Sequence, residues 1–203
     1  MIIAFILVII AFVLLYRSMN NLQVSSRPKT MQTRQTKTEP TSFERAEQLF
    51  AEKNYTEAES LYVEALKTDH KNVVLYQRLA TIYRALGKTT DMVDCIQIVT
   101  QLSPTSEHFH QLGVVMYENR NYIKAISAFQ KSLMLDASAR GYVALGRSFQ
   151  KISNVTKAVK AYERAADLEV NRHTLMALAE GYKQAGQSTK AQAAIERLKR
   201  LEQ

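Results

Sequence analysis

Residues 106–135, SEHFHQLGVVMYENRNYIKAISAFQKSLML, contain one complete unit of a pattern that recurs along this chain. A very small residue, Gly113, is followed twelve positions later by Ala125 and four positions after that by Phe129. The same spacing of small and large apolar residues returns five times, with a period of 33 or 34 residues. Such a period is typical of stacked supersecondary units, each of which buries its apolar face against its neighbours.

Each unit predicts two antiparallel helices joined by a short turn. The small residues are Ala46, Ala80, Gly113, Gly146 and Ala179; the landmarks that follow are Ala58, Met92, Ala125, Ala158 and Ala191; the larger side chains after these are Tyr62, Ile96, Phe129, Tyr162 and Ile195. Helices are predicted over about 73–86, 89–102, 106–118, 122–135, 139–151 and 155–168. The first unit begins near Thr41, where a capping box to Glu44 is expected, and the fifth runs from about Arg172 to the end of the chain.

Local residue choices agree with these helix ends. Small residues are expected where the first helix of a unit approaches its partner closely, because a large side chain would push the pair apart. Gly87 and Gly186 are predicted to end first helices in a left-handed conformation. Asn54, Asn121 and Asn154 are predicted to cap the second helices.

This pattern resembles the tetratricopeptide repeat family over about residues 39–203. The strings that carry the resemblance are Leu112-Gly113, Asn121-Tyr122-Ile123-Lys124-Ala125 and Leu145-Gly146. The resemblance implies an all-α fold, a right-handed α-solenoid of about five helix-turn-helix repeats. The expected repeats are 41–72, 73–105, 106–138, 139–171 and 172–203. Arg45 in the family's leucine position, Met92 in place of an alanine and the absence of tryptophan are departures that leave this fold expectation unchanged.

Residues 1–16, MIIAFILVIIAFVLLY, predict an uncleaved transmembrane signal-anchor helix. They would cover about 24 Å as a helix, and Arg17 can extend this towards the roughly 30 Å of a hydrocarbon layer by snorkelling. A cleaved signal peptide is the alternative, although no basic residue precedes the apolar run and no Ala-x-Ala string follows it. The basic residues after the run predict a single-pass membrane protein with cytoplasmic repeats. The small size and the compact anchor favour a bacterial inner membrane, and an organelle membrane is the alternative.

Residues 17–40 are predicted to be a flexible basic linker between the anchor and a repeat domain over 41–203. Residues 1–38 contain five basic and no acidic side chains, whereas the rest of the chain contains 22 basic and 19 acidic ones. The linker is either a solvated tether or a segment that also attracts anionic headgroups. The nearly balanced repeat region argues against a nucleic-acid surface.

No pattern of catalytic residues is present, so the protein is not expected to be an enzyme and no cofactor or metal is expected. His108 and His110 are two residues apart on a predicted helix and therefore face different directions, which makes them a poor metal pair. Cys95, the one cysteine, is predicted to be a buried and inert thiol.

The family resemblance implies that the first helix of each repeat lines a concave groove that binds ligands. The groove positions carried over to this sequence are Gln77, Arg78, Thr81, Arg84, His110, Val114, Tyr117, Arg140, Val143, Arg147, Gln150, Lys151, Met176, Glu180 and Lys183. Their basic centre suggests an acidic or carboxylate-bearing peptide as partner, and an ordinary solvated helix face is the alternative. Gln77 and Thr81 stand where the chaperone-binding members have lysine and asparagine, so binding of a chaperone tail is not expected.

The leading hypothesis is a membrane-tethered scaffold that recruits or assembles protein partners at the cytoplasmic face of a membrane. An exported repeat protein acting in envelope, pilus or secretion-complex assembly is an alternative, and a helical-repeat nucleic-acid binder is a further one. The last predicted helix, near Ser188 to Leu201, has Ile195 and Leu198 on one side. This end is expected either to meet a partner or a second copy of the chain, or to be a modestly apolar end of the array.

Overall fold

The computed structural model describes residues 41–201, which form ten α-helices and no strand within that range. The helices are α2 (Ser42–Ala51), α3 (Tyr55–Thr68), α4 (Val73–Ala85), α5 (Thr89–Leu102), α6 (Ser106–Glu118), α7 (Tyr122–Leu135), α8 (Ala139–Lys151), α9 (Val155–Leu168), α10 (Arg172–Gln184) and α11 (Ser188–Leu201). They lie within one compact unit, Thr41–Gln203.

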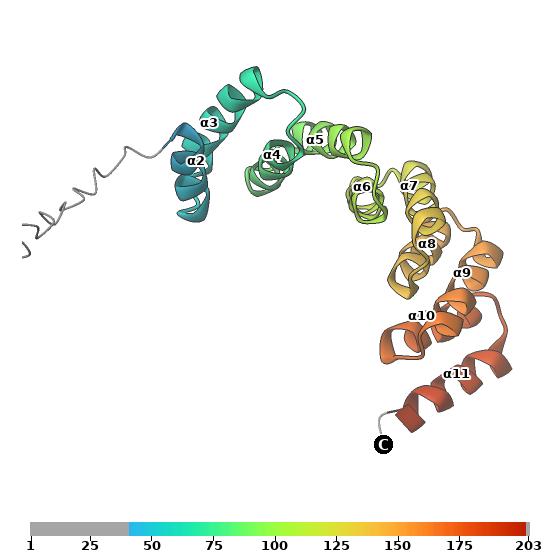
Figure 1. Cartoon of the computed structure of the whole chain (residues 1–203). Coiled ribbons are helices and arrows are strands. Elements are labelled where there is room, and N and C mark those ends of the chain that lie inside the picture. Colours follow the sequence, from blue (N-terminus) through green and yellow to red (C-terminus); the bar gives the residue numbers. More distant parts are fainter. Residues whose placement is uncertain (1–40, 202–203) are drawn as a thin grey trace, which may run out of the picture. The chain divides into compact units, whose positions relative to one another are not determined.

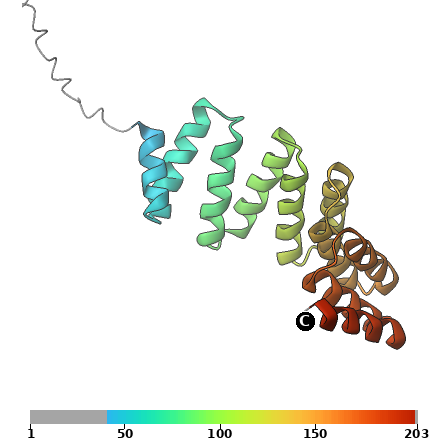
Figure 2. The same ribbon diagram turned by 60° about the horizontal axis from the view of Figure 1, so that its bottom comes forward.

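Each even-numbered helix pairs with the helix that follows it to make a hairpin, and successive hairpins stack side by side into a curved array (Figures 1 and 2). Helices α4, α6, α8 and α10 lie on the inner, concave side of the curve, and α5, α7 and α9 lie on the outer side (Figure 1). The expected stack of helix-turn-helix units is therefore confirmed for the described residues.

Close packing of glycine against an aromatic ring explains the small residues of the pattern. A Cβ atom added at Gly113 would come within 2.5 Å of the ring of Phe129, and one added at Gly146 would come within 2.5 Å of the ring of Tyr162. In the next hairpin Gly181 meets the opposite edge of Tyr162, at 2.6 Å for an added Cβ. The Tyr162 ring is thus held between two helix backbones and is only 2% exposed.

The buried apolar side chains form two clusters. One joins the first two hairpins, from Ala46 to Ile96, with Val115 of α6. The other joins the last three hairpins, from Met116 to Ala194. The array is therefore stabilised by nearest-neighbour contacts rather than by one central core, as expected for stacked repeats.

The predicted helix ends agree closely with the structure. The six helices predicted between residues 73 and 168 begin at the predicted residues and end within one residue of the prediction. The capping box between Thr41 and Glu44 is present, and Gly87 and Gly186 have φ angles of 71° and 69°. In the other three hairpin turns, the same left-handed conformation is adopted by Lys53, Arg120 and Ser153. The sequence did not predict these three turns, because none of these residues is a glycine.

One predicted cap is wrong. The side chains of Asn121 and Asn154 accept hydrogen bonds from the backbone nitrogens of Lys124 and Lys157, at 3.3 and 3.2 Å. The side chain of Asn54 makes no such bond, and α3 instead has Glu57 in its first turn. A carboxylate there stabilises the helix through its dipole without a capping bond.

No helix within residues 41–201 is both long enough and apolar enough to cross a membrane. The predicted anchor, residues 1–16, and the predicted linker, residues 17–40, lie outside the described residues.

Candidate functional site

The concave face carries a first groove of about 610 Å³ between α4 and α6. It is lined by Gln77, Ala80, Thr81, Arg84, Ile96, Val99, Glu107, His110, Gln111, Val114 and Arg140. Its apolar floor is Ile96 and Val99 of α5, which are 7% and 1% exposed. The walls come from α4 and α6 and are mainly polar, so this groove suits a ligand that forms hydrogen bonds along its length.

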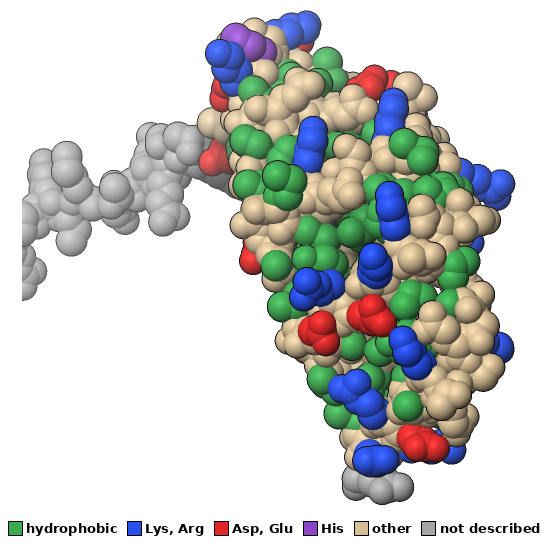
Figure 3. All heavy atoms as spheres, turned by 90° about the vertical axis from the view of Figure 1, so that its right-hand side faces the viewer, with side chains coloured by type: hydrophobic (Ala, Val, Ile, Leu, Met, Phe, Trp, Pro, Cys, Tyr) green, Lys and Arg blue, Asp and Glu red, His purple; other side chains and the backbone are tan. Residues whose placement is uncertain are grey.

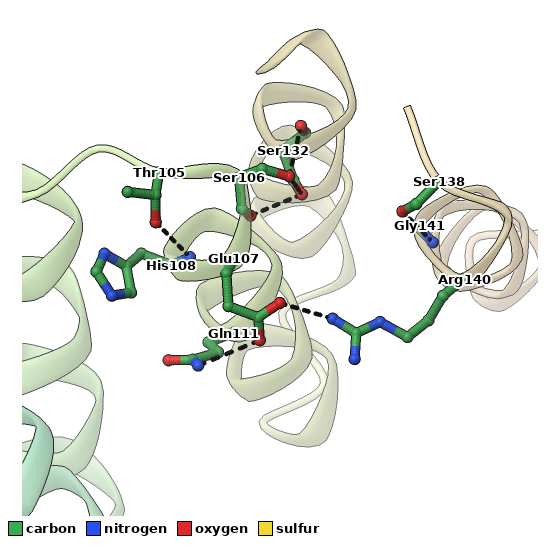
Figure 4. A network of polar contacts seen from close by, with 9 residues as sticks. All are labelled: Thr105, Ser106, Glu107, His108, Gln111, Ser132, Ser138, Arg140 and Gly141. Carbon is green, nitrogen blue, oxygen red and sulfur yellow. Dashed lines mark hydrogen bonds and ion pairs between the residues drawn. The ribbon is translucent and has the colours of Figure 1, made fainter. Parts of the chain in front are cut away.

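The arginines of the first groove already form ion pairs with glutamates of the chain. The guanidinium of Arg140 donates to Glu107 Oε2 at 2.8 Å, and Glu107 also accepts from Gln111 at 3.3 Å (Figure 4). Arg84 lies 3.8 Å from Glu118. An acidic ligand in this groove would therefore have to compete with carboxylates of the chain itself.

His110 is a buried wall residue of the first groove. Its ring centroid lies 5.3 Å from that of Phe129, and only 8% of the residue is exposed. Burial lowers the pKa of its imidazole, and the nearby positive charge of Arg140 lowers it further, with Glu107 acting in the opposite direction. His110 is therefore a neutral packing residue in the folded protein at neutral pH.

The end of α6 beside the first groove is fixed by a pair of serines. Ser106 Oγ lies 3.1 Å from both the backbone oxygen and the hydroxyl of Ser132, and Ser132 Oγ donates to the backbone oxygen of Ser106 at 2.8 Å (Figure 4). Ser132 is only 2% exposed. These bonds join α6 to α7 and so hold Glu107 in place to receive Arg140.

A second groove of about 490 Å³ lies at the other end of the concave face, between α8 and the last hairpin. It is lined by Arg147, Gln150, Tyr162, His173, Met176, Ala177, Ala179, Glu180, Lys183, Ala191, Ile195 and Leu198. Its lining is more apolar than that of the first groove, and Met176 and Ile195 are 50% and 37% exposed. No helix of the described chain follows α11 to cover Ile195, whereas α6 covers its counterpart Ile96.

The cations of the second groove are free to meet a ligand. Neither Arg147 nor Lys183 is paired with a carboxylate of the described residues, and both are exposed. Glu180 accepts a hydrogen bond from Gln184 at 2.9 Å. The second groove therefore combines an open apolar floor with two unpaired cations.

The predicted site residues divide between these grooves. Those in the first groove are Gln77, Thr81, Arg84, His110, Val114 and Arg140; those in the second are Arg147, Gln150, Met176, Glu180 and Lys183. Four others line neither groove: Arg78, Tyr117, Val143 and Lys151. Tyr117 packs against Tyr122, with ring centroids 5.4 Å apart, and Lys151 is exposed.

Arg78 and Val143 were expected in the groove but line neither of the two grooves. Arg78 makes two 2.8 Å bonds to the carboxylate of Glu47 and lies over the ring of Phe50. Glu47 also accepts from the hydroxyl of Tyr62 at 2.7 Å, and the bond from Arg78 is the main reason that the pKa of Glu47 is lowered. Val143 is only 1% exposed because α8 turns it into the core.

The groove floors were not predicted as site residues. They come from the second helices of the hairpins, at the fourth and seventh positions after each landmark residue, namely Ile96 and Val99 in one groove and Ile195 and Leu198 in the other. The repeat spacing contains this signal, since the same pair of positions recurs in each hairpin. The family resemblance points to the first helices alone, so it does not indicate these positions of the second helices.

Comparison with known proteins agrees with this architecture. A family model described as "Tetratricopeptide repeat" matches residues 139–169, which correspond to the hairpin of α8 and α9. Residues 139–169 are therefore similar to a tetratricopeptide repeat. The same residue pattern recurs in all five described hairpins.

Solved structures share the fold of the array at low sequence identity. A crystal structure of MamA matches with a TM-score of 0.69 and 20% identity, covering 77% of this chain and 87% of that one. YrrB, described as a TPR protein with an unusual peptide-binding site, matches with a TM-score of 0.65 and 14% identity, covering 80% of this chain and 86% of that one. Both likenesses concern the fold alone.

A curated relative is the Hsp70-Hsp90 organizing protein 1 of Glycine max, which is 29% identical over 94 residues. The match covers 46% of this chain and spans only 16% of the length of that relative.

Proposed function

We propose that this protein is a scaffold that binds protein partners on the concave face of its repeats and is held at a membrane by residues 1–16. The observation that carries the binding role is the pair of grooves, of about 610 and 490 Å³, which the same repeat positions form at two places on one face. The likeness to tetratricopeptide repeat structures supports the role, because one of them is described as having a peptide-binding site.

The two grooves suit different parts of a partner. Polar groups such as Gln77 and Thr81 line the first groove, whose arginines are already paired with glutamates. The second groove has an apolar floor and the unpaired Arg147 and Lys183. We therefore assign the preference for an acidic partner to the second groove, where apolar side chains flanked by carboxylates would be complementary.

The second groove lies at the end of the array, so a second copy of the chain is also a candidate occupant. Leu201 is 49% exposed and Ile195 is 37% exposed. Against this, α11 has Gln192 and Lys199 at repeat positions where α9 has the buried Val159 and Ala166. These polar replacements make the end of the array a cap, which favours a different protein as the occupant.

The membrane tether and the cytoplasmic side rest on the sequence of residues 1–16 and of the basic residues that follow. A tether would confine the scaffold to the membrane and raise the effective concentration of its partners there without any further contact. Deletion of residues 1–16 should make the protein extractable from membranes with carbonate. If the shortened chain still resisted extraction with carbonate, the anchor assignment would be wrong.

Site-specific photo-crosslinking tests the binding role. A photoreactive amino acid replaces Met176 in the second groove of the full-length protein, and the matched control places it at Lys71, which is exposed in the loop between α3 and α4. We expect defined protein adducts from Met176 only, and their loss in Arg147→Glu/Lys183→Glu. Adducts with the chain itself would reveal self-association, and equal adducts from both positions would contradict a groove-specific partner.

A further inference from the structure

The second helices of the hairpins reverse the sign of their charge along the array. Helices α3 and α5 carry five acidic side chains and one basic one, whereas α7, α9 and α11 carry nine basic and three acidic ones. All nine cations are exposed, and none is paired with a carboxylate of the described residues. The second helices of the last three hairpins thus present a net charge of +6 that the array itself does not neutralise.

Six of these cations form two rows that follow the repeat. The first row is Lys124, Lys157 and Lys190, and the second row is Lys131, Arg164 and Arg197. On each helix the two rows are seven residues apart, which is two helical turns or about 10.5 Å, so both rows face the same side. At the repeat positions equivalent to the first row, the first two hairpins have the acidic residues Glu57 and Asp91. The repeat fold therefore does not require cations there.

Large apolar side chains stand among these cations. Ile123 is 66% exposed, Met134 is 86% exposed and Leu168 is 52% exposed. Figure 3 shows the outer face of the array, where lysine and arginine side chains are spread over the surface with apolar side chains between them. Nucleic acid would leave such apolar groups in water, whereas the interfacial layer of a bilayer takes them up.

The distribution over three helices also favours an extended partner over a single peptide. Helices α7 and α9 lie on the outer side of the array (Figure 1), and none of the nine cations lines either groove. Their long side chains can reach a flat surface from a curved one. Phosphate headgroups supply the many negative charges that two rows of cations require.

We propose that the outer face of α7, α9 and α11 binds the surface of a membrane that contains anionic lipids. The two rows of cations contact lipid phosphates, and Ile123, Met134 and Leu168 enter the interfacial layer. The concave grooves then face away from the membrane and stay open to partners. This inference goes beyond the scaffold role and does not depend on residues 1–16.

A vesicle-binding experiment with the fragment 41–203 tests the proposal without the predicted anchor. The fragment contains both buried clusters of the array, and its helix content is checked by circular dichroism. Sedimentation is measured with phosphatidylcholine vesicles that contain or lack phosphatidylglycerol, at low and high salt. We expect binding to the anionic vesicles only, with affinity that falls as salt rises.

Charge reversal locates the contact. The variant Lys131→Glu/Arg164→Glu/Arg197→Glu should lose about a hundredfold in affinity for anionic vesicles. The matched control, Arg84→Glu/Arg147→Glu/Lys183→Glu, reverses three cations of the concave grooves and should change the affinity less than about twofold. If the first variant folds poorly, Lys124→Gln/Lys157→Gln/Lys190→Gln tests the other row and should also lower the affinity for anionic vesicles.

Two further measurements test the contribution of the exposed apolar side chains to vesicle binding and the binding of polyanions other than lipids. Met134→Ser/Leu168→Ser should weaken vesicle binding several-fold, because exposed apolar side chains no longer enter the interface. The proposal is overturned if the wild-type fragment does not bind anionic vesicles, or if the concave control loses as much as the row variants. It is equally overturned if duplex DNA or polyglutamate binds through the rows while vesicles do not. The groove photo-crosslinking is independent of all these outcomes.

Discussion

The boundary between the last two hairpins differs from the other three boundaries in the forces that join the hairpins. In the first part of the array, charged side chains connect successive hairpins: Arg78 with Glu47, and Lys88 with Glu59, at 2.8 Å each. Between α8–α9 and α10–α11 no such pair is found among the described residues. There the Tyr162 ring sits directly against glycine backbones on both sides.

This difference shows that hairpins with one residue pattern can be joined in two ways, which leave different numbers of unpaired cations on the surface. Ion pairs between hairpins neutralise cations, as they do for Arg78 and Arg140. Packing of a ring on a glycine backbone needs no charge. At the boundary between the last two hairpins, Arg147 and Lys183 therefore have no carboxylate partner among the described residues and are available to other molecules.

The largest expected effect comes from breaking the steric packing. Gly146→Val should lower the free energy of unfolding by about 3 kcal/mol, because the new side chain overlaps the buried Tyr162 ring. Urea unfolding followed by circular dichroism measures the loss. The control is Ala80→Gly at the equivalent position of the second hairpin, where the cost should be about 1 kcal/mol from helix propensity. An unchanged midpoint for Gly146→Val would mean that the ring can move aside.

Breaking the ionic connection should have a smaller effect. Glu47→Gln should cost about 1 kcal/mol, because the pair with Arg78 is partly exposed and water screens it. The pKa of Glu47 is lowered in the fold, so its contribution is present above pH 4.5 and is lost as the pH falls further. The control is Glu163→Gln in the last hairpins, where the carboxylate accepts from Tyr182 and has no arginine partner. Equal pH dependence in wild type and Glu47→Gln would contradict the assignment.

Relief of backbone strain at a hairpin turn should give a small gain in the opposite direction. Ser153 has a φ angle of 57°, a conformation that glycine adopts without steric cost. Ser153→Gly should raise the free energy of unfolding by about 0.5 kcal/mol, since the relief exceeds the extra entropy of the unfolded chain. Thermal unfolding compares it with Ser127→Gly, an exposed position within α7 where the same change should destabilise.

The smallest effect concerns His110, at the junction of the two parts. Its pKa is lowered in the folded protein, so the unfolded state takes up a proton more readily and stability falls as the pH decreases below 6.5. His110→Gln should show a weaker loss of thermal stability between neutral and mildly acidic pH than the wild type. The matched control is His70→Gln, at an exposed histidine in the loop between α3 and α4.

Helix ends and turns were predictable because they depend on neighbours in the sequence. The period of 33 or 34 residues and the residues at the turns locate the six helices predicted between residues 73 and 168 to within one residue, and the capping box marks the start of α2 at Thr41. The left-handed turns at Lys53, Arg120 and Ser153 escaped prediction because no glycine marks them. There the geometry of the hairpin overrides the preference of the residue.

The candidate site was only partly predictable. The register of the first helices located eleven residues that line one of the two grooves, Gln77 and Lys183 among them. It could not show that Arg78 bonds Glu47, because this bond joins residues 31 positions apart and depends on how two hairpins stack. It also could not show that Arg84 and Arg140 are paired while Arg147 is not.

The sequence by itself determined that this is an array of paired helices, because the spacing of small and large apolar residues decides which faces can pack closely. It also determined the number of cations on each helix. Only the tertiary structure decided which cations stay free, since an ion pair requires two side chains from different hairpins to meet within a few ångström. That meeting depends on stacking geometry, which no local pattern contains.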